Sequence, residues 1–191
     1  MARTPSTMVE LGTAAPDFAL PDPAGRVWRL AEIATGDATV VMFICNHCPF
    51  VKHIADQIAQ LARDYAGRPV SFVAINANDV ANYPDDAPPR MAETARDWGL
   101  TFPYLFDESQ AVAKAYRAAC TPDFYVFDRQ RRLAYRGQLD AARPGSDVPV
   151  TGADLRAAID ALVAGKPPSG TQMPSIGCNI KWKPGNQPDY A

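Results

Sequence analysis

The sequence predicts an α/β fold with a mixed central β-sheet flanked by helices, and three observations support this prediction. Residues 39–44 form an unbroken apolar, largely β-branched run that is typical of a buried strand, and a helical pattern begins at Pro49. A second buried strand at residues 70–76 completes a strand-helix-strand unit, which implies a parallel crossover. Residues 123–128 and 133–137 then form a hairpin, which adds antiparallel strands.

The other elements follow from shorter patterns along the chain. Residues 12–30 hold two short strand-like pieces around a Pro/Gly turn, and they predict an N-terminal β-hairpin at a sheet edge, where proline is tolerated. A short strand is expected at residues 103–106. Further helices are expected at residues 90–98, 109–118 and 153–164. We expect a loose arm at residues 1–10, one domain at 11–164 and an extended Pro/Gly-rich C-terminal tail at 165–191.

Composition and charge exclude several classes of function. With 191 residues and 47% hydrophobic residues, the chain is long enough for one full hydrophobic core. The net charge is −2, from 19 basic and 21 acidic residues, so we expect neither nucleic acid nor a membrane surface as a partner. There is no apolar signal-like segment near the start, which favours a cytoplasmic protein. Four cysteines are too few for a disulfide scaffold and favour catalysis or metal binding.

The first buried strand leads directly into a turn with two cysteines, Cys45 and Cys48. Because Pro49 suits the first position of a helix, Cys48 is expected to cap that helix, with the free backbone N–H groups facing its sulfur. A thiolate is favoured in such a position, and the thiolate is the reactive form of cysteine. We therefore predict that Cys48 is a redox nucleophile and that Cys45, three residues earlier, is its resolving partner.

Two histidines lie near this turn, and the sequence leaves two interpretations open. His47 could stabilise the Cys48 thiolate or move a proton, whereas His53 and Lys52 lie farther along the helix. Alternatively, thiolate and imidazole ligands together suit copper(I) or zinc. The candidate ligands of such a site are Cys45, Cys48, His47 and His53. A second Cys-x-x-Cys pair is missing, so we expect a site without metal.

The order of these features resembles the thioredoxin fold. The segment GTAAPDFALPDPAG (residues 12–25) is similar to the start of the peroxiredoxin branch, which comprises the AhpC/TSA and redoxin group. The segments CNHCPFVK (45–52), NAND (76–79), YPDD (83–86) and GCNIKW (177–182) resemble a peroxiredoxin-like subgroup with a Cys-x-x-Cys motif. The resemblance implies a thioredoxin-like three-layer fold and a thiol-based redox activity.

The resemblance also assigns residues around the cysteines. It implies that Pro122 is the cis-proline of the fold and that Thr121 and Pro122 face the cysteines. Cys120 would then lie near the site, as a third redox thiol or, as we favour, as a packing residue. Cys178 could reach the site from the tail as an alternative resolving thiol, or pair with another subunit.

The peroxiredoxin pattern Pro-x-x-x-Thr-x-x-Cys is incomplete in this chain. The pattern would place its proline and threonine at positions that hold Val41 and Cys45, and the second cysteine of thioredoxin would be at Val51. We therefore expect a thiol-disulfide oxidoreductase more than a peroxiredoxin-type antioxidant peroxidase. Its substrate would be a disulfide or a peroxide, its electron donor a thioredoxin-like or low-molecular-weight thiol, and no cofactor would be needed.

A third alternative is a non-catalytic copper- or zinc-binding or partner-binding module on the same fold. The sequence leaves open whether the chain acts alone or as a homodimer.

Overall fold

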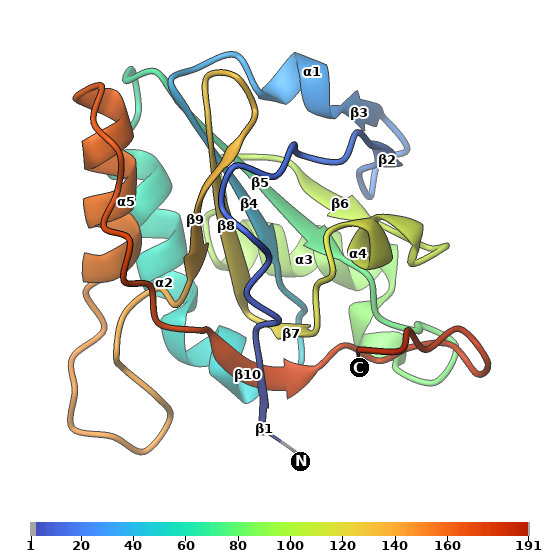
Figure 1. The fold of residues 1–191 in the computed structure, drawn as a ribbon. Helices are drawn as coiled ribbons and strands as arrows, with labels where there is room; N and C mark the ends of the chain where they lie inside the picture. Colours follow the sequence, from blue (N-terminus) through green and yellow to red (C-terminus); the bar gives the residue numbers. More distant parts are fainter. Residues whose placement is uncertain (1–2, 191) are drawn as a thin grey trace.

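The computed structural model describes residues 3–190 (Figure 1). In it, the apolar run after residue 37 forms β4 (Ala38–Phe43), the middle strand of a five-stranded sheet. All six residues of β4 are buried, because the strand has a neighbour on each side and helices over both faces. The order across the sheet is β6 (Tyr104–Phe106), β5 (Val70–Asn76), β4, β8 (Asp123–Asp128) and β9 (Leu133–Gly137).

The sheet is mixed, as predicted. β4, β5 and β6 are parallel, with Phe43 opposite Ile75 at the end of the β4–β5 ladder. β8 runs antiparallel to β4, and β9 antiparallel to β8, so the predicted hairpin forms one edge of the sheet. The helices are α1 (Leu30–Ile33), α2 (Pro49–Asp64), α3 (Pro88–Asp97), α4 (Ala111–Ala115) and α5 (Ala153–Val163), with a 3-10 turn, η1, at Pro84–Asp86.

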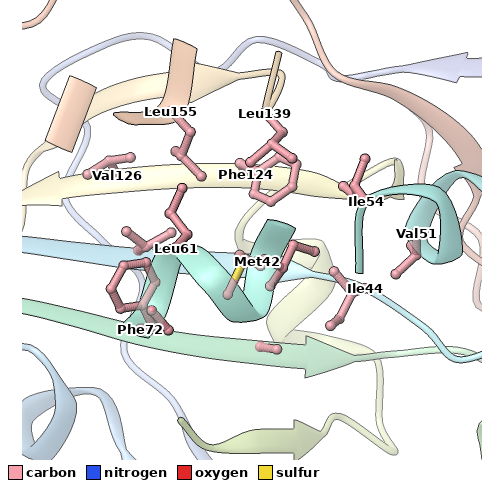
Figure 2. Packing of buried hydrophobic residues seen from close by; sticks show 14 of the residues in the cluster. Met42, Ile44, Val51, Ile54, Leu61, Phe72, Phe124, Val126, Leu139 and Leu155 are labelled. Carbon is pink, nitrogen blue, oxygen red and sulfur yellow. The ribbon is translucent and has the colours of Figure 1, made fainter. Parts of the chain in front are cut away.

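Alternation along the strands divides the core into two clusters, one on each face of the sheet. On one face, α2, α3 and α5 cover Met42 and its neighbours, and Figure 2 shows Leu61 of α2 among these side chains, near Phe72. On the other face, α1, α4 and the tail cover Val41 and its neighbours. Each large apolar side chain buried in this way stabilises the fold by about 1.5–3 kcal/mol. The core therefore fixes the end of β4, where the cysteine turn begins.

Two small sheets lie outside the central one. β2 (Ala19–Pro21) and β3 (Val27–Arg29) form the predicted N-terminal hairpin, but as a separate two-stranded sheet and not as an edge of the central sheet. β1 (Arg3–Pro5), β10 (Ile176–Asn179) and β7 (Cys120–Thr121) form a three-stranded sheet in the order β1-β10-β7. In Figure 1, this sheet lies at the end of the molecule where α2 begins.

The described part of the N-terminal segment is not the loose arm that we expected. Arg3–Pro5 pairs with β10, and the Ser6 N–H donates to the Ser175 carbonyl at 2.9 Å. The reason is that the tail supplies a partner strand, which no local pattern in residues 1–10 could indicate. None of the helices in the described residues combines the length and the apolar character that a membrane span needs.

Candidate active site

Cys48 has the position that the sequence predicts, as the N-cap of α2 with Pro49 in the first turn. Its backbone is extended, with φ −66° and ψ 123°, and its carbonyl accepts hydrogen bonds from the N–H groups of Val51 and Lys52 at 3.1 and 3.0 Å. Cys45 lies two residues beyond the end of β4. The short link between strand and helix therefore brings both thiols to the positive end of α2.

Both cysteines are enclosed by the segment that contains the cis Thr121–Pro122 bond. The Cys48 Sγ lies 3.2 Å from the Thr121 carbonyl oxygen, and the Cys45 Sγ lies 3.4 Å from the Thr121 Oγ1. Cys48 is 0% exposed and Cys45 is 1% exposed. The structure thus brings Thr121 and Pro122 beside the cysteines, as the resemblance implied, and it covers both sulfur atoms.

The two thiols ionise in opposite directions. A hydrogen bond from the Cys45 thiol is the largest cause that lowers the pKa of Cys48 to about 4. The Cys178 thiol and the N–H groups of Val51 and Cys178 add further donors, which together outweigh the effect of burial. The same contact raises the pKa of Cys45 well above its ordinary value, with burial as the second cause. These shifts favour ionisation of Cys48 over ionisation of Cys45. The Cys48 Sγ can donate to the Thr121 carbonyl only while Cys48 is a thiol.

His47 forms an ion pair with a residue that the sequence did not indicate. Its Nδ1 lies 2.6 Å from the Asp86 Oδ2, and its ring stacks on Tyr83 with centroids 5.6 Å apart. The hydrogen bond to Asp86 raises the pKa of His47 despite partial burial. Asp86 is itself buried, and the Asn46 N–H and the Asn78 side-chain amide donate to it at 2.7 and 2.8 Å.

The signal for Asp86 was present in the sequence but could not be interpreted from it. The YPDD segment is a distinct motif in the sequence, yet Asp86 lies 38 residues after Cys48. Only the parallel pairing of β4 with β5 brings the end of β5, and the loop after it, beside that turn. A carboxylate in a loop after a parallel strand is a candidate for such a site, because carboxyl ends of parallel strands share one edge.

Two of the four candidate metal ligands, Cys45 and His47, lie in one group of possible ligands. Among the described residues, the side chains that offer ligand atoms within 4.8 Å of one another are Cys45, His47 and Asp86. Cys48 and His53 are not in this group. His53 lies one turn into α2, where it lines a small cavity with Pro122 and Gln138, and Lys52 is exposed.

The remaining two cysteines have different surroundings. Cys120 is buried, its Sγ lies 3.5 Å from the Pro122 carbonyl oxygen, and burial raises its pKa well above the ordinary value. These contacts agree with a packing role. Cys178 lies opposite Thr121 in the β10–β7 ladder and hydrogen-bonds to Cys48, and burial is the first cause that raises its pKa to about 12. The structure thus brings Cys178 to the site, from the tail.

The chain is similar to several known proteins. The thiol-disulfide oxidoreductase ResA of Geobacillus thermodenitrificans (strain NG80-2) is 28% identical over 132 residues, which cover 68% of this chain and 70% of that protein. The crystal structure of an uncharacterized conserved protein from Geobacillus kaustophilus is 56% identical, with a TM-score of 0.94, and the match covers 96% of this chain and 98% of that one.

A more distant match shows the fold. The crystal structure of a thiol:disulfide interchange protein of the thioredoxin family from Chlorobium tepidum TLS has a TM-score of 0.59 at 20% identity, over 82% of this chain and 97% of that one. The thiol-disulfide oxidoreductase homologues support an oxidoreductase. Residues 11–136, which are most of the chain, match the model of the AhpC/TSA family. The chain is a thioredoxin-fold member of the AhpC/TSA family.

Proposed function

We propose that the chain is a thiol-disulfide oxidoreductase in which Cys48 is the nucleophile and Cys45 the resolving thiol. The observation that carries this proposal is the placement of two thiols in contact at the N-terminus of α2, where Cys48 is the N-cap. This contact lowers the pKa of Cys48 to about 4 and raises that of Cys45. A nucleophile must be a thiolate, whereas a resolving thiol stays protonated until the first bond has formed.

The reaction follows from these positions. The Cys48 thiolate attacks a substrate disulfide, and one substrate sulfur leaves as a thiol after taking a proton. The Cys45 thiol then attacks the Cys48 sulfur, releases the second substrate thiol and leaves a Cys45–Cys48 disulfide. The substrate has gained two electrons and two protons, and an external thiol donor of the thioredoxin-like or low-molecular-weight class returns them to the enzyme. His47, whose pKa is raised by its hydrogen bond to Asp86, is the proposed proton donor for the leaving thiolate.

Peroxide reduction is the second candidate, and the burial of the site favours it. Cys48 is 0% exposed, so a protein disulfide would reach it only after the covering segment has moved, whereas hydrogen peroxide is small enough to need little space. The thiolate would then attack one peroxide oxygen and break the O–O bond, which gives a Cys48 sulfenic acid, and the leaving hydroxide would take up a proton to become water. Cys45 would convert this sulfenic acid to the same Cys45–Cys48 disulfide, with loss of a second water.

The deciding experiment compares two oxidants on the fully reduced protein. Rates with hydrogen peroxide and with a small disulfide such as oxidised glutathione are followed, and the linkages are mapped by peptide mass. The main proposal is supported if the disulfide oxidises the protein faster than it oxidises a free thiol and the product is the Cys45–Cys48 disulfide. The second candidate is supported if only hydrogen peroxide gives this result. The Cys48→Ser variant should lose both reactions, whereas Cys120→Ser should keep them.

The experiment also tests the non-catalytic alternative. Protein purified without reductant or chelator is analysed for zinc and copper. A stoichiometric metal ion together with no acceleration by either oxidant would overturn the enzymatic proposal and support a metal site on Cys45, His47 and Asp86.

A further inference from the structure

Cys178 is the third thiol at the site, although it lies 130 residues beyond Cys48 in the chain. It is on β10, which lies between β1 and β7 at the end of the molecule where α2 begins (Figure 1). In the β10–β7 ladder Cys178 is directly opposite Thr121, the residue whose carbonyl oxygen is 3.2 Å from the Cys48 Sγ. Cys45, Cys48 and Cys178 all belong to one buried cluster.

The contact of Cys178 with Cys48 involves two groups. Both its thiol and its backbone N–H donate hydrogen bonds to the Cys48 sulfur. The Cys48 sulfur therefore meets two different thiols, Cys45 from its own turn and Cys178 from the C-terminal strand. Cys120, by contrast, is next to Thr121 on β7 but has its sulfur against the Pro122 carbonyl.

Neighbouring contacts fix the position of β10. The Ser175 hydroxyl donates to the Pro122 carbonyl at 2.6 Å, and the Ile180 N–H donates to the Ala119 carbonyl at 3.1 Å. Gly177 approaches β7 so closely that a side chain there would overlap the carbonyl of Thr121. Only glycine allows this approach, so the sequence around Cys178 is suited to holding its thiol against Cys48.

We propose that Cys178 is a second resolving thiol for Cys48. The inference rests on the proposed function, because it requires Cys48 to be oxidised first by a peroxide or a disulfide. With peroxide, the Cys178 thiol attacks the Cys48 sulfenic acid, a Cys48–Cys178 bond forms and water leaves with the thiol proton. With a disulfide, the Cys178 thiol attacks the Cys48 sulfur of the mixed disulfide, and the substrate thiol leaves with the proton.

Cys45 then completes the cycle. Its thiol attacks the Cys48 sulfur of the Cys48–Cys178 bond, which gives the Cys45–Cys48 disulfide and returns Cys178 to the thiol form. No further oxidant is needed for this exchange, because one disulfide is replaced by another. While the Cys48–Cys178 bond lasts, β10 is covalently attached to the start of α2 and the site stays covered.

The test uses the full chain with Cys45→Ser, which removes the first resolving thiol. The reduced variant receives one equivalent of hydrogen peroxide, remaining thiols are alkylated after acid quenching, and the linkages are mapped by peptide mass. The proposal predicts an intramolecular Cys48–Cys178 disulfide as the main product. Adding Gly177→Ala to this variant, which keeps every remaining thiol but displaces β10, should slow the formation of this disulfide several-fold. Adding Cys120→Ser should leave its rate and yield unchanged.

The outcomes separate this proposal from the proposed function. If Cys48 in the Cys45→Ser variant is oxidised to a sulfenic or sulfinic acid, or links two chains, while Cys178 remains open to alkylation, Cys178 is not a resolving thiol and the proposed function stands. If Cys48 resists both peroxide and oxidised glutathione in the wild-type chain as well, the proposed function itself fails. Circular dichroism of each variant shows whether a lost reaction reflects lost folding.

Discussion

The ionisation of Cys48 depends on the hydrogen bonds that reach its sulfur, and this leads to a prediction on pH. With a pKa of about 4, Cys48 remains a thiolate when the pH falls from neutral to mildly acidic values. Its rate of alkylation by iodoacetamide should therefore stay nearly constant over that range and fall as the pH passes below about 4. Alkylation of the Cys48 peptide, followed by mass spectrometry across pH, measures this.

A matched pair of variants identifies the donor. Cys45→Ala removes the largest cause of the lowered pKa of Cys48, so the pH midpoint of Cys48 alkylation should rise toward the ordinary thiol value of about 8.5. Cys45→Ser keeps a hydroxyl donor at the same place and should raise the midpoint less. Equal midpoints in both variants and in the wild type would mean that Cys45 does not control the ionisation of Cys48.

The pair of His47 with Asp86 links stability to pH. The pKa of His47 is raised, so its contribution is complete below the unfolded value of about 6.5 and is lost as the pH rises through the folded value. The pKa of Asp86 is lowered, so its contribution is complete above about 4 and is lost as the pH falls through its folded value. Both contributions are present between these two pH values.

Replacing Asp86 with Asn should therefore cost most in that window. Three donors lose a charged acceptor, which predicts a loss of about 1–3 kcal/mol in the free energy of unfolding. The pKa of His47, measured by NMR, should also fall. Asp85→Asn is the control, because the Asp85 side chain is exposed and only its carbonyl contacts the site. A stability loss that does not vary with pH would mean that the His47–Asp86 charge pair is not its cause.

At the scale of elements, a buried ion pair joins the two strands of the hairpin β8–β9, and a hydrogen bond from Ser6 links this pair to the N-terminal segment. The Arg136 Nη2 lies 3.0 Å from the Asp123 Oδ2, both side chains are fully buried, and the Ser6 hydroxyl donates to the other Asp123 oxygen at 2.7 Å. Removing one charge leaves the other without compensation. Arg136→Met should lower the free energy of unfolding by about 3–5 kcal/mol, measured by denaturant titration.

A second substitution tests the cause of this loss. Adding Asp123→Asn to Arg136→Met removes the unpaired carboxylate and keeps an acceptor for Ser6, so part of the loss should be recovered. Arg129→Ala is the surface control, because the Arg129–Asp37 pair is exposed and should contribute less than about 1 kcal/mol. If the double variant recovers none of the free energy of unfolding, the loss comes from the packing of the Arg136 side chain and not from an unpaired charge.

An element could be predicted from the sequence when the pattern that produces it lies within its own segment. β4, β5, α2 and α5 were predicted closely, because a continuous apolar run or a helical repeat is contained within each segment. β1 and β10 have only three and four residues, and their partners lie far away in the chain, so no local pattern predicts them.

The helix expected at residues 109–118 is shorter for a similar reason. α4 begins only after Gln110, which has φ 63° and donates its side-chain amide to the carbonyls of Ala77 and Lys181. Tertiary contacts therefore overrode the helical pattern at this end.

The same distinction applies to the candidate site. Cys45, His47 and Cys48 lie within four residues. Their positions follow from the local pattern of a strand, a turn and a proline that begins a helix. Thr121 and Pro122 required the resemblance to a known fold. Asp86 and Cys178 reach the site through β5 and β10, so their positions depend on pairing of distant strands.

At the scale of the whole molecule, the tail is part of the core. Ile180 is 1% exposed and belongs, with Trp182, to the cluster under β4 and β5 on the face opposite α2. Gln110 and Asn78 also bind the backbone of the tail at Lys181 and Lys183. The chain should therefore unfold as one cooperative unit, with no separate transition for its last residues.

Ile180→Ala tests this cooperativity. Removing three buried carbon atoms should lower the free energy of unfolding of the whole chain by about 2–4 kcal/mol and leave a single transition. The unfolding midpoints from far-ultraviolet circular dichroism and from tryptophan fluorescence should shift together in denaturant titrations. Met173→Ala, which truncates a side chain that is 58% exposed, should change neither midpoint. If the tail were an appended arm, the circular dichroism transition of Ile180→Ala would stay at the wild-type midpoint while fluorescence near Trp182 changed early. That result would also mean that β10 does not unfold together with the elements that hold Cys48. The circular dichroism midpoint of Ile180→Ala therefore tests both the role of the tail in the core and the position of Cys178.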